Sequence, residues 1–216
     1  MTSGLLLTAS HMGTKDRRSR EKVARREAIL QAAKAIFVRK GVLATTMDDV
    51  AQRAEVAKGT LYLHFRTREE MFSALMDEGL ALVVHRFGEA IDPSLPADEN
   101  LRRLCEAYCR FYREEPQYFK LLFFCSHADV RAKTCANPGE CQGLPPLAAV
   151  IQKGIDEKTF PPTVDPATAA AIVWASSNGL ILMFEQERGS FSRPIEELLR
   201  TNIELLIRGL KAKHEA

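Results

Sequence analysis

Residues 46–65 constrain the fold most, because they contain two short helical patterns with almost no chain between them. The first pattern places apolar residues at helical spacing, namely Met47, Val50, Ala51 and Ala54. Thr46 stands three residues before Asp49, which predicts a capping box at the start of this helix. Glu55-Val56-Ala57 leaves room only for a tight turn before a second short helix, 58–64. This arrangement predicts a helix-turn-helix.

Helices are also predicted on both sides of this motif. An amphipathic helix is expected over residues 25–40, with an apolar face made of Ile29, Ala32, Ala33, Ile36 and Phe37. Gly41 ends that helix. Thr67-Arg68-Glu69-Glu70 has the form of a full capping box and begins a long helix through Phe87. We expect this long helix to join two domains.

The rest of the chain continues with helical periodicity and shows no strand alternation. The predicted helices cover residues 101–112, 117–125, 147–157, 166–187 and 194–211, and residues 134–146 are predicted to form a loop. Asp165-Pro166 has the form of an N-cap followed by proline in the first turn. We therefore predict an all-α fold of about nine helices. Its parts are a flexible basic N-terminal arm (1–24), a helix-turn-helix domain (25–70) and a second helical domain (71–216).

Charge is distributed unevenly along the chain. Residues 1–68 hold 14 Lys/Arg and 6 Asp/Glu, a net charge of +8, whereas the remaining residues carry a net charge of −6. This asymmetry favours a polyanionic partner for the N-terminal part. Seven basic residues fall within 15–26 and form either an arm that follows phosphates or enters a minor groove, or a solvated tail.

Cysteine content and hydropathy indicate the compartment. Five cysteines are an odd number in a chain without an export signal, which argues against a disulfide framework and for the cytoplasm. Every uninterrupted apolar run is shorter than the roughly 20 residues that cross a bilayer, so we expect no membrane partner.

The second helix of the motif is predicted to present a polar outer face. Leu61 and Phe65 should pack against the first helix of the motif. This leaves cationic, hydroxyl and aromatic residues exposed to solvent, together with one glycine: Lys58, Gly59, Thr60, Tyr62 and His64. Such groups suit contact with a polyanionic duplex, so we predict that the chain binds double-stranded DNA.

The same region resembles the N-terminal domain of the TetR family of bacterial regulators. The resemblance is carried by residues 29–40, Thr45-Thr46-Met47-Asp48-Asp49-Val50-Ala51, Val56 to Phe65 and Thr67-Arg68-Glu69-Glu70-Met71-Phe72. It implies phosphate contacts from Thr46, Tyr62, His64 and Arg68, and base or backbone contacts from Lys58, Gly59 and Thr60. For Thr46 and Tyr62 the alternatives are a purely capping role and partial packing.

Two residues depart from the commonest family pattern, which has Gly in the turn and Ser before the recognition helix. This chain has Glu55 and Ala57 at those places. If the turn requires positive φ at Glu55, the strain should cost about 1 kcal/mol. Ala57 offers no side-chain cap, so we expect no phosphate contact from it.

The resemblance also implies a homodimer that binds a small molecule in its second domain and then releases a palindromic operator. The last two predicted helices carry broad apolar faces that could form a four-helix bundle with their copies, or simply cover the monomer core. A hydrophobic or aromatic effector is expected, with no cofactor. Its candidate contacts are Tyr112, Phe119, Phe123, Trp174 and Met183.

Three alternatives remain open at this point. A metal- or redox-responsive regulator would use Cys125, His127, Cys135 and Cys141, whereas Cys105 and Cys109 should pack as small apolar residues. A nonspecific architectural protein would bind any duplex alike. An all-α enzyme is disfavoured, because the chain has no phosphate-binding glycine loop, zinc-protease motif or nucleophile elbow, so we predict that it is not an enzyme.

Overall fold

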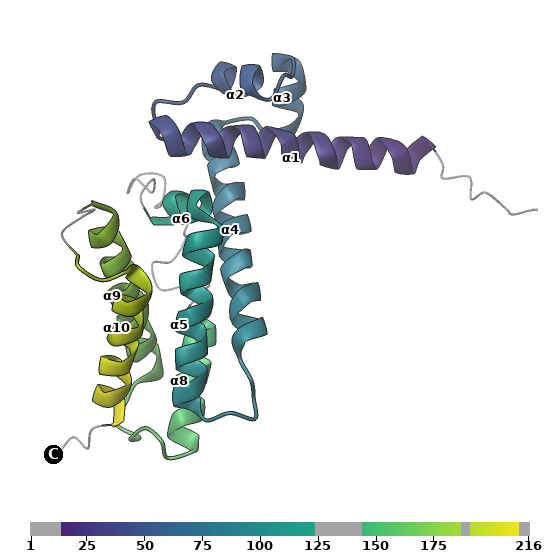
Figure 1. Ribbon diagram of the computed structural model, residues 1–216. Coiled ribbons are helices and arrows are strands. Elements are labelled where there is room, and N and C mark those ends of the chain that lie inside the picture. The colour runs from purple at the N-terminus through teal and green to yellow at the C-terminus, as the bar shows by residue number, and fades with distance from the viewer. Residues whose placement is uncertain (1–13, 124–143, 187–190, 212–216) are drawn as a thin grey trace, which may run out of the picture. The chain divides into compact units, whose positions relative to one another are not determined.

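The computed structural model describes residues 14–123, 144–186 and 191–211, which form nine α-helices and contain no strand (Figure 1). The predicted all-α class is therefore confirmed, and each predicted helix corresponds to an observed one. The chain divides into two compact units, Met1–Phe72 and Ser73–Ala216. Helix α4 (Arg68–Ala90) begins in the first unit and continues into the second.

The first unit contains α1 (Thr14–Lys40), α2 (Met47–Arg53), α3 (Lys58–His64) and the first turn of α4. Its core confirms the predicted apolar face of the first helix. The buried side chains include Ile29, Ala33, Ile36, Phe37, Val50, Leu61, Phe65, Met71 and Phe72. Phe37 and Phe72 meet edge to face at 6.1 Å between ring centroids, so α1 and the start of α4 share one core.

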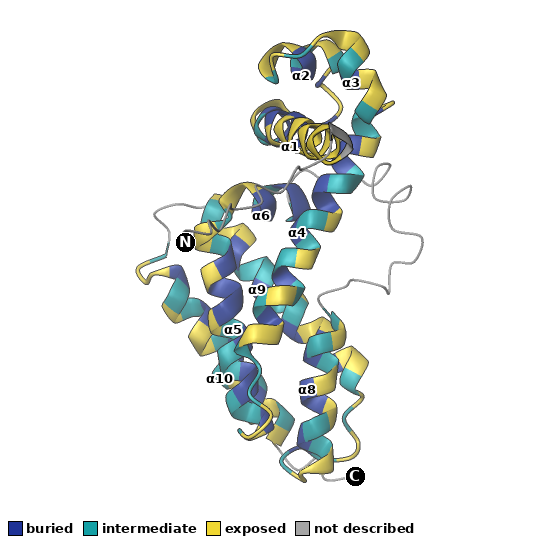
Figure 2. Cartoon of the chain, turned by 90° about the vertical axis from the view of Figure 1, so that its right-hand side faces the viewer, coloured by how far each residue is buried: buried dark blue, intermediate teal, exposed yellow. Residues whose placement is uncertain are grey.

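Helix α1 begins at Thr14, well before the predicted start at residue 25. No glycine or proline interrupts residues 14–40, and Arg17 pairs with Glu21 one turn away at 3.5 Å. Residues 16–28 are all exposed, and the turns of α1 that face the viewer are yellow in Figure 2. The basic segment predicted as a flexible arm is helical from Thr14 onward, because helix-forming residues do not need a buried face to continue a helix already anchored in the core.

The second unit is built around α5 (Ala97–Glu114), which packs against α6 (Pro116–Phe123), α8 (Leu144–Asp156) and α10 (Ile195–Lys211). Helix α9 (Pro166–Gln186) packs against α8 and α10. Asp165 accepts a hydrogen bond from the Thr168 N–H at 2.8 Å, which confirms the predicted cap. Helix α8 starts inside the predicted loop 134–146, because its two prolines fall in the first turn, where no N–H is needed.

Two close contacts fix the ends of helices in the second unit. The buried Asn100 amide donates to the Asp92 and Leu95 carbonyls at 2.8 and 3.1 Å and accepts from the Asp92 N–H at 2.8 Å. In α8, a Cβ added to Gly154 would lie 2.2 Å from the Phe160 ring. Only glycine lets Phe160 pack there.

Helix α9 is long and apolar enough, by length and composition alone, to cross a membrane. The sequence expectation missed it because polar Thr, Ser and Asn interrupt the apolar run, although no charge occurs over residues 166–184. Its buried side chains are Ala169, Ala170, Val173, Ser177 and Ile181. These residues belong to the face that packs against α8 and α10, so α9 is a packing helix of the second unit.

Candidate nucleic-acid interface

The turn between α2 and α3 has the strained geometry expected from its sequence. Glu55 adopts φ 54°, and its N–H donates to the Gln52 carbonyl at 3.2 Å. Left-handed backbone at a residue with a Cβ costs about 1 kcal/mol or more. Ala57 is the N-cap residue of α3 and makes no side-chain cap bond. Both departures from the family pattern therefore have the predicted structural effect.

Thr46 and Asp49 form the predicted capping box at the start of α2. The Asp49 N–H donates to the Thr46 hydroxyl at 3.2 Å, and the Thr46 N–H donates to the Asp49 carboxylate at 2.7 Å. Lys40 contacts the same carboxylate at 2.5 Å, and these bonds hold the pKa of Asp49 far below its usual value. Because the Thr46 hydroxyl also donates to Asp49, Thr46 is engaged within the protein.

Helix α3 separates a buried side from an outward side, as predicted. Leu61 is fully buried, and Phe65 is buried just beyond the helix. The structure brings the five predicted DNA-facing residues of α3 together on the remaining surface, where Lys58, Gly59 and Tyr62 are exposed and Thr60 and His64 are partly exposed. A Cβ added to Gly59 would meet no atom within 4 Å. Packing within the protein therefore does not require glycine at this position.

Leu63 is an exposed residue of α3 that the sequence analysis did not single out. Its accessible fraction is 81%. The signal was available, because Leu63 lies two positions from both Leu61 and Phe65, which places it on the opposite side of the helix from each.

An ion pair joins α3 to α2. The Lys58 ammonium lies 2.6 Å from the Asp48 carboxylate, which raises the pKa of Lys58. Both side chains are exposed, so this pair contributes little stability and can exchange for another anion.

Arg68 is partly exposed, and its guanidinium makes hydrogen bonds within the first unit. Its Nη1 donates to the Leu43 and Thr45 carbonyls at 2.6 and 3.1 Å, and its Nε donates to Glu69 at 2.8 Å. These bonds fasten the loop between α1 and α2. The Thr67 hydroxyl caps α4 as predicted by accepting from the Glu70 N–H, but the Glu70 carboxylate accepts from the Arg66 N–H, one residue earlier than in a regular capping box.

Basic residues of α1 lie beside the end of α3. The Arg26 guanidinium lies 4.9 Å from the centroid of the Phe65 ring, a cation–π contact. Partial burial lowers the pKa of His64, and the nearby cations Lys22, Arg25 and Arg26 lower it further. The positive charge of α1 therefore extends to the exposed side of α3.

Four of the five predicted effector contacts form one aromatic cluster in the second unit. Ring centroids are 4.7 Å apart for Phe119 and Phe123, 5.0 Å for Tyr112 and Phe119, and 5.8 Å for Phe123 and Trp174. A cavity of about 20 Å³ adjoins Trp174. Met183 does not join this cluster; it is half exposed on α9, because it follows the outward side of that helix.

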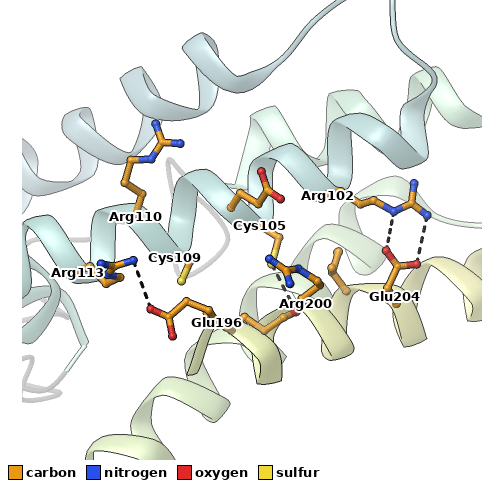
Figure 3. A pocket seen from close by; sticks show the side chains of 11 residues that line it. Arg102, Cys105, Cys109, Arg110, Arg113, Glu196, Arg200 and Glu204 are labelled. Atoms are coloured by element: carbon orange, nitrogen blue, oxygen red, sulfur yellow. Dashed lines mark hydrogen bonds and ion pairs between the residues drawn. The ribbon is translucent and has the colours of Figure 1, made fainter. Parts of the chain in front are cut away.

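Cys105 and Cys109 lie in a groove of about 300 Å³ between α5 and α10 (Figure 3). Ion pairs of Arg102 with Glu204 at 2.6 Å and of Arg113 with Glu196 at 3.5 Å flank the two cysteines. Burial raises the pKa of the Cys105 thiol to about 12 and also raises that of Cys109. Both thiols are therefore protonated and poorly reactive, which agrees with the predicted packing role.

The proposed metal or redox residues Cys125, His127, Cys135 and Cys141 lie outside the described residues. Within the described ranges, no group of three or more potential metal ligands occurs.

The geometry of the first unit defines a class of protein. Two short helices joined by a tight turn, with the second helix packed on one side and polar on the other, form a helix-turn-helix, the motif of DNA-binding regulators.

Comparison with known proteins identifies the family. Residues 29–75 match the family described as bacterial regulatory proteins, tetR family, and residues 101–206 match the tetracyclin repressor-like C-terminal domain. The chain belongs to the TetR family of bacterial transcriptional regulators.

Several known proteins match most of this chain. It is 29% identical over 194 residues to the uncharacterized regulator YhgD of Bacillus subtilis, covering 88% of this chain and 98% of that protein. It is 28% identical over 152 residues to the repressor KstR2 of Mycobacterium tuberculosis, covering 66% and 72%. The crystal structure of the TetR family regulator PfmR from Thermus thermophilus aligns with a TM-score of 0.64 and 28% identity, covering 85% and 99%.

Proposed function

We propose that this regulator is a cytoplasmic, dimeric repressor that occupies a palindromic operator and releases it when a small molecule binds the second unit. The observation that carries the proposal is the outward side of α3. Its residues lie together in the segment of net charge +8, with Lys58, Gly59 and Tyr62 exposed and no packing requirement for glycine at position 59. These outward residues of α3 can therefore contact double-stranded DNA.

Within this surface the residues take different parts. Lys58 and Thr60 lie in the first turn of α3, where recognition helices of this motif contact base edges, and Gly59 permits close approach. Tyr62 and His64 are assigned to phosphates. Thr46 caps α2 and Arg68 anchors the preceding loop, and we assign both to phosphates as well, through the part of each side chain that stays exposed.

The exposed N-terminal half of α1 is proposed as a second phosphate-binding element. Its basic residues are presented on a helix whose Arg26 is docked on Phe65, next to α3. Replacing Arg17, Arg18 and Arg20 with alanine should flatten the slope of log K against log salt by about 0.9 for each phosphate that the variant no longer neutralises. An unchanged slope would show that this segment is only a solvated surface.

The dimer is proposed to form through α9 and α10. Single-chain packing leaves large apolar side chains of these helices at the surface, namely Ile172, Leu182, Met183 and Leu205. Pairing with a second copy would bury them in a four-helix bundle. Met183→Glu should therefore give a monomer by light scattering, whereas the control Leu43→Glu, at an exposed leucine outside these helices, should stay dimeric. A dimeric Met183→Glu variant would contradict this interface.

The effector is proposed to be hydrophobic or aromatic and to bind at the aromatic cluster. Trp174 is the only tryptophan in the chain, so its fluorescence reports on this cluster directly. Titration with a naphthalene-class aromatic probe should change the Trp174 emission and release operator DNA over the same concentration range. Because a ligand acts only through different affinities for two states, emission changes without release would contradict the coupling.

Selection of bound sequences from random duplex DNA tests the proposed function as a whole. A dimer that presents two copies of α3 should enrich a pseudo-palindrome with two half-sites about one helical turn, or a multiple of it, apart. No enrichment would contradict the proposal. A promoter containing the selected site, placed before a reporter, should be silenced by the protein, and stimulation would contradict repression.

A further inference from the structure

Leu63 is an exposed leucine on the outward side of α3 and makes no contribution to the core. It is the most exposed of the large apolar side chains in the part of the chain that the structure describes. Because successive helical residues turn by about 100°, Leu63 lies roughly opposite both Leu61 and Phe65, which hold α3 on the core. It therefore occupies the centre of the outward side of α3.

Gly59 lies one turn before Leu63 on the same outward line. Since open space surrounds Gly59, these two residues form an apolar strip along the middle of the surface. The same helical geometry places Lys58 and Tyr62 on one flank of the strip and Thr60 on the other. The strip is thus bordered by groups suited to phosphates and base edges, while its centre offers no hydrogen bond.

We infer that Leu63 contacts the C5-methyl group of a thymine in the major groove and so fixes one position of the operator sequence. This inference rests on the proposed function, in which α3 lies in that groove. Among the groups that base pairs present there, the thymine methyl is the apolar one, and the others are hydrogen-bond donors and acceptors. Leucine against those groups would leave them unpaired, whereas against a methyl it removes apolar surface from water.

Replacing thymine with deoxyuridine tests the inference, because the exchange removes only the methyl and keeps the base pair. Operator DNA from the random selection would carry deoxyuridine at one thymine position at a time, in both half-sites. Wild-type protein should lose affinity about fourfold per half-site at one such position. Leu63→Ala loses the same contact in both half-sites, so it should bind the unmodified operator at least about sixteenfold more weakly and show no further loss with deoxyuridine.

Leu43→Ala is the matched control, since Leu43 is also exposed but lies in the loop between α1 and α2. It should keep wild-type affinity and the wild-type response to deoxyuridine. Unfolding curves of both variants should match wild type, because neither side chain is buried. Equal deoxyuridine losses in wild type and Leu63→Ala, or no loss at any position, would overturn the inference while leaving operator binding established. If wild type selects no sequence at all, it is the proposed function that fails.

Discussion

Gly59 and Gly154 are both helical glycines, and the difference between them separates the two units of this protein. Space around Gly154 is filled by Phe160, so the second unit needs that glycine in order to pack. Space around Gly59 is open, so the first unit does not need it. Gly154 is thus required by the packing of the second unit, whereas Gly59 is free to serve the DNA contact proposed for the outward side of α3. A substitution at Gly154 should therefore lower stability, whereas one at Gly59 should lower operator affinity and leave stability unchanged.

Gly154→Ala should have the largest effect on stability. The added Cβ would lie 2.2 and 2.4 Å from Phe160 ring carbons and 2.9 Å from the Ala97 Cβ, so the helix or the ring must move. Overpacking of this kind costs about 3 kcal/mol in the free energy of unfolding, which denaturant titration would measure. The control Gly88→Ala adds a Cβ with no neighbour within 4 Å and should not destabilise. Equal effects of the two substitutions would contradict the packing assigned to Gly154.

Gly59→Ala should have the opposite effect, with a loss of operator affinity and no loss of stability. We expect unchanged or slightly higher stability, because alanine is a better helix former and no atom opposes its Cβ. Operator affinity should fall about tenfold, since the methyl group separates α3 from the duplex. Fluorescence anisotropy and denaturant titration on the same preparation would measure both quantities. Unchanged affinity would show that the outward side of α3 does not approach DNA closely at this position.

Glu55→Gly should stabilise the first unit by about 1 kcal/mol, because glycine adopts the observed positive φ without strain. Glu55→Ala removes the same charge but keeps the Cβ, and it should give no such gain. A gain of equal size in both variants would assign the effect to charge rather than to the backbone.

The smallest predicted effect concerns His64. Its pKa is lowered in the folded protein, so the folded state binds the proton less readily than the unfolded state does. The stability this provides is present above the ordinary histidine pKa of about 6.5 and is lost as pH falls below it. Between about pH 7 and pH 5.5, wild type should therefore lose slightly more stability than His64→Gln. If the stability of wild type and of His64→Gln fell equally over this pH range, the predicted direction of the His64 effect would be contradicted.

Local features of this protein could be predicted from the sequence because their causes lie within a few residues. The capping box of Thr46 and Asp49, the cap at Asp165 and the positive φ of Glu55 each depend on neighbours in the same turn or helix end. The outward residues of α3 followed from helical periodicity once Leu61 was placed in the core.

Other features depend on partners distant in sequence, and periodicity does not reveal them. The Arg68 guanidinium binds carbonyls more than twenty residues away, at Leu43 and Thr45, which no local pattern indicates. The isolation of Met183 from the aromatic cluster depends likewise on which side of α9 packs inward. The start of α1 at Thr14 was missed for a different reason, because an exposed charged helix has no apolar stripe to mark it.

The ratio between specific and nonspecific DNA binding tests the central claim most directly. Equilibrium binding of the purified protein would be measured at physiological salt, against the selected operator and against a scrambled duplex of the same length and composition. Sequence reading by α3 predicts at least about 10³-fold tighter binding to the operator. Similar affinity for both duplexes would contradict it and would leave only nonspecific attraction to the basic surface.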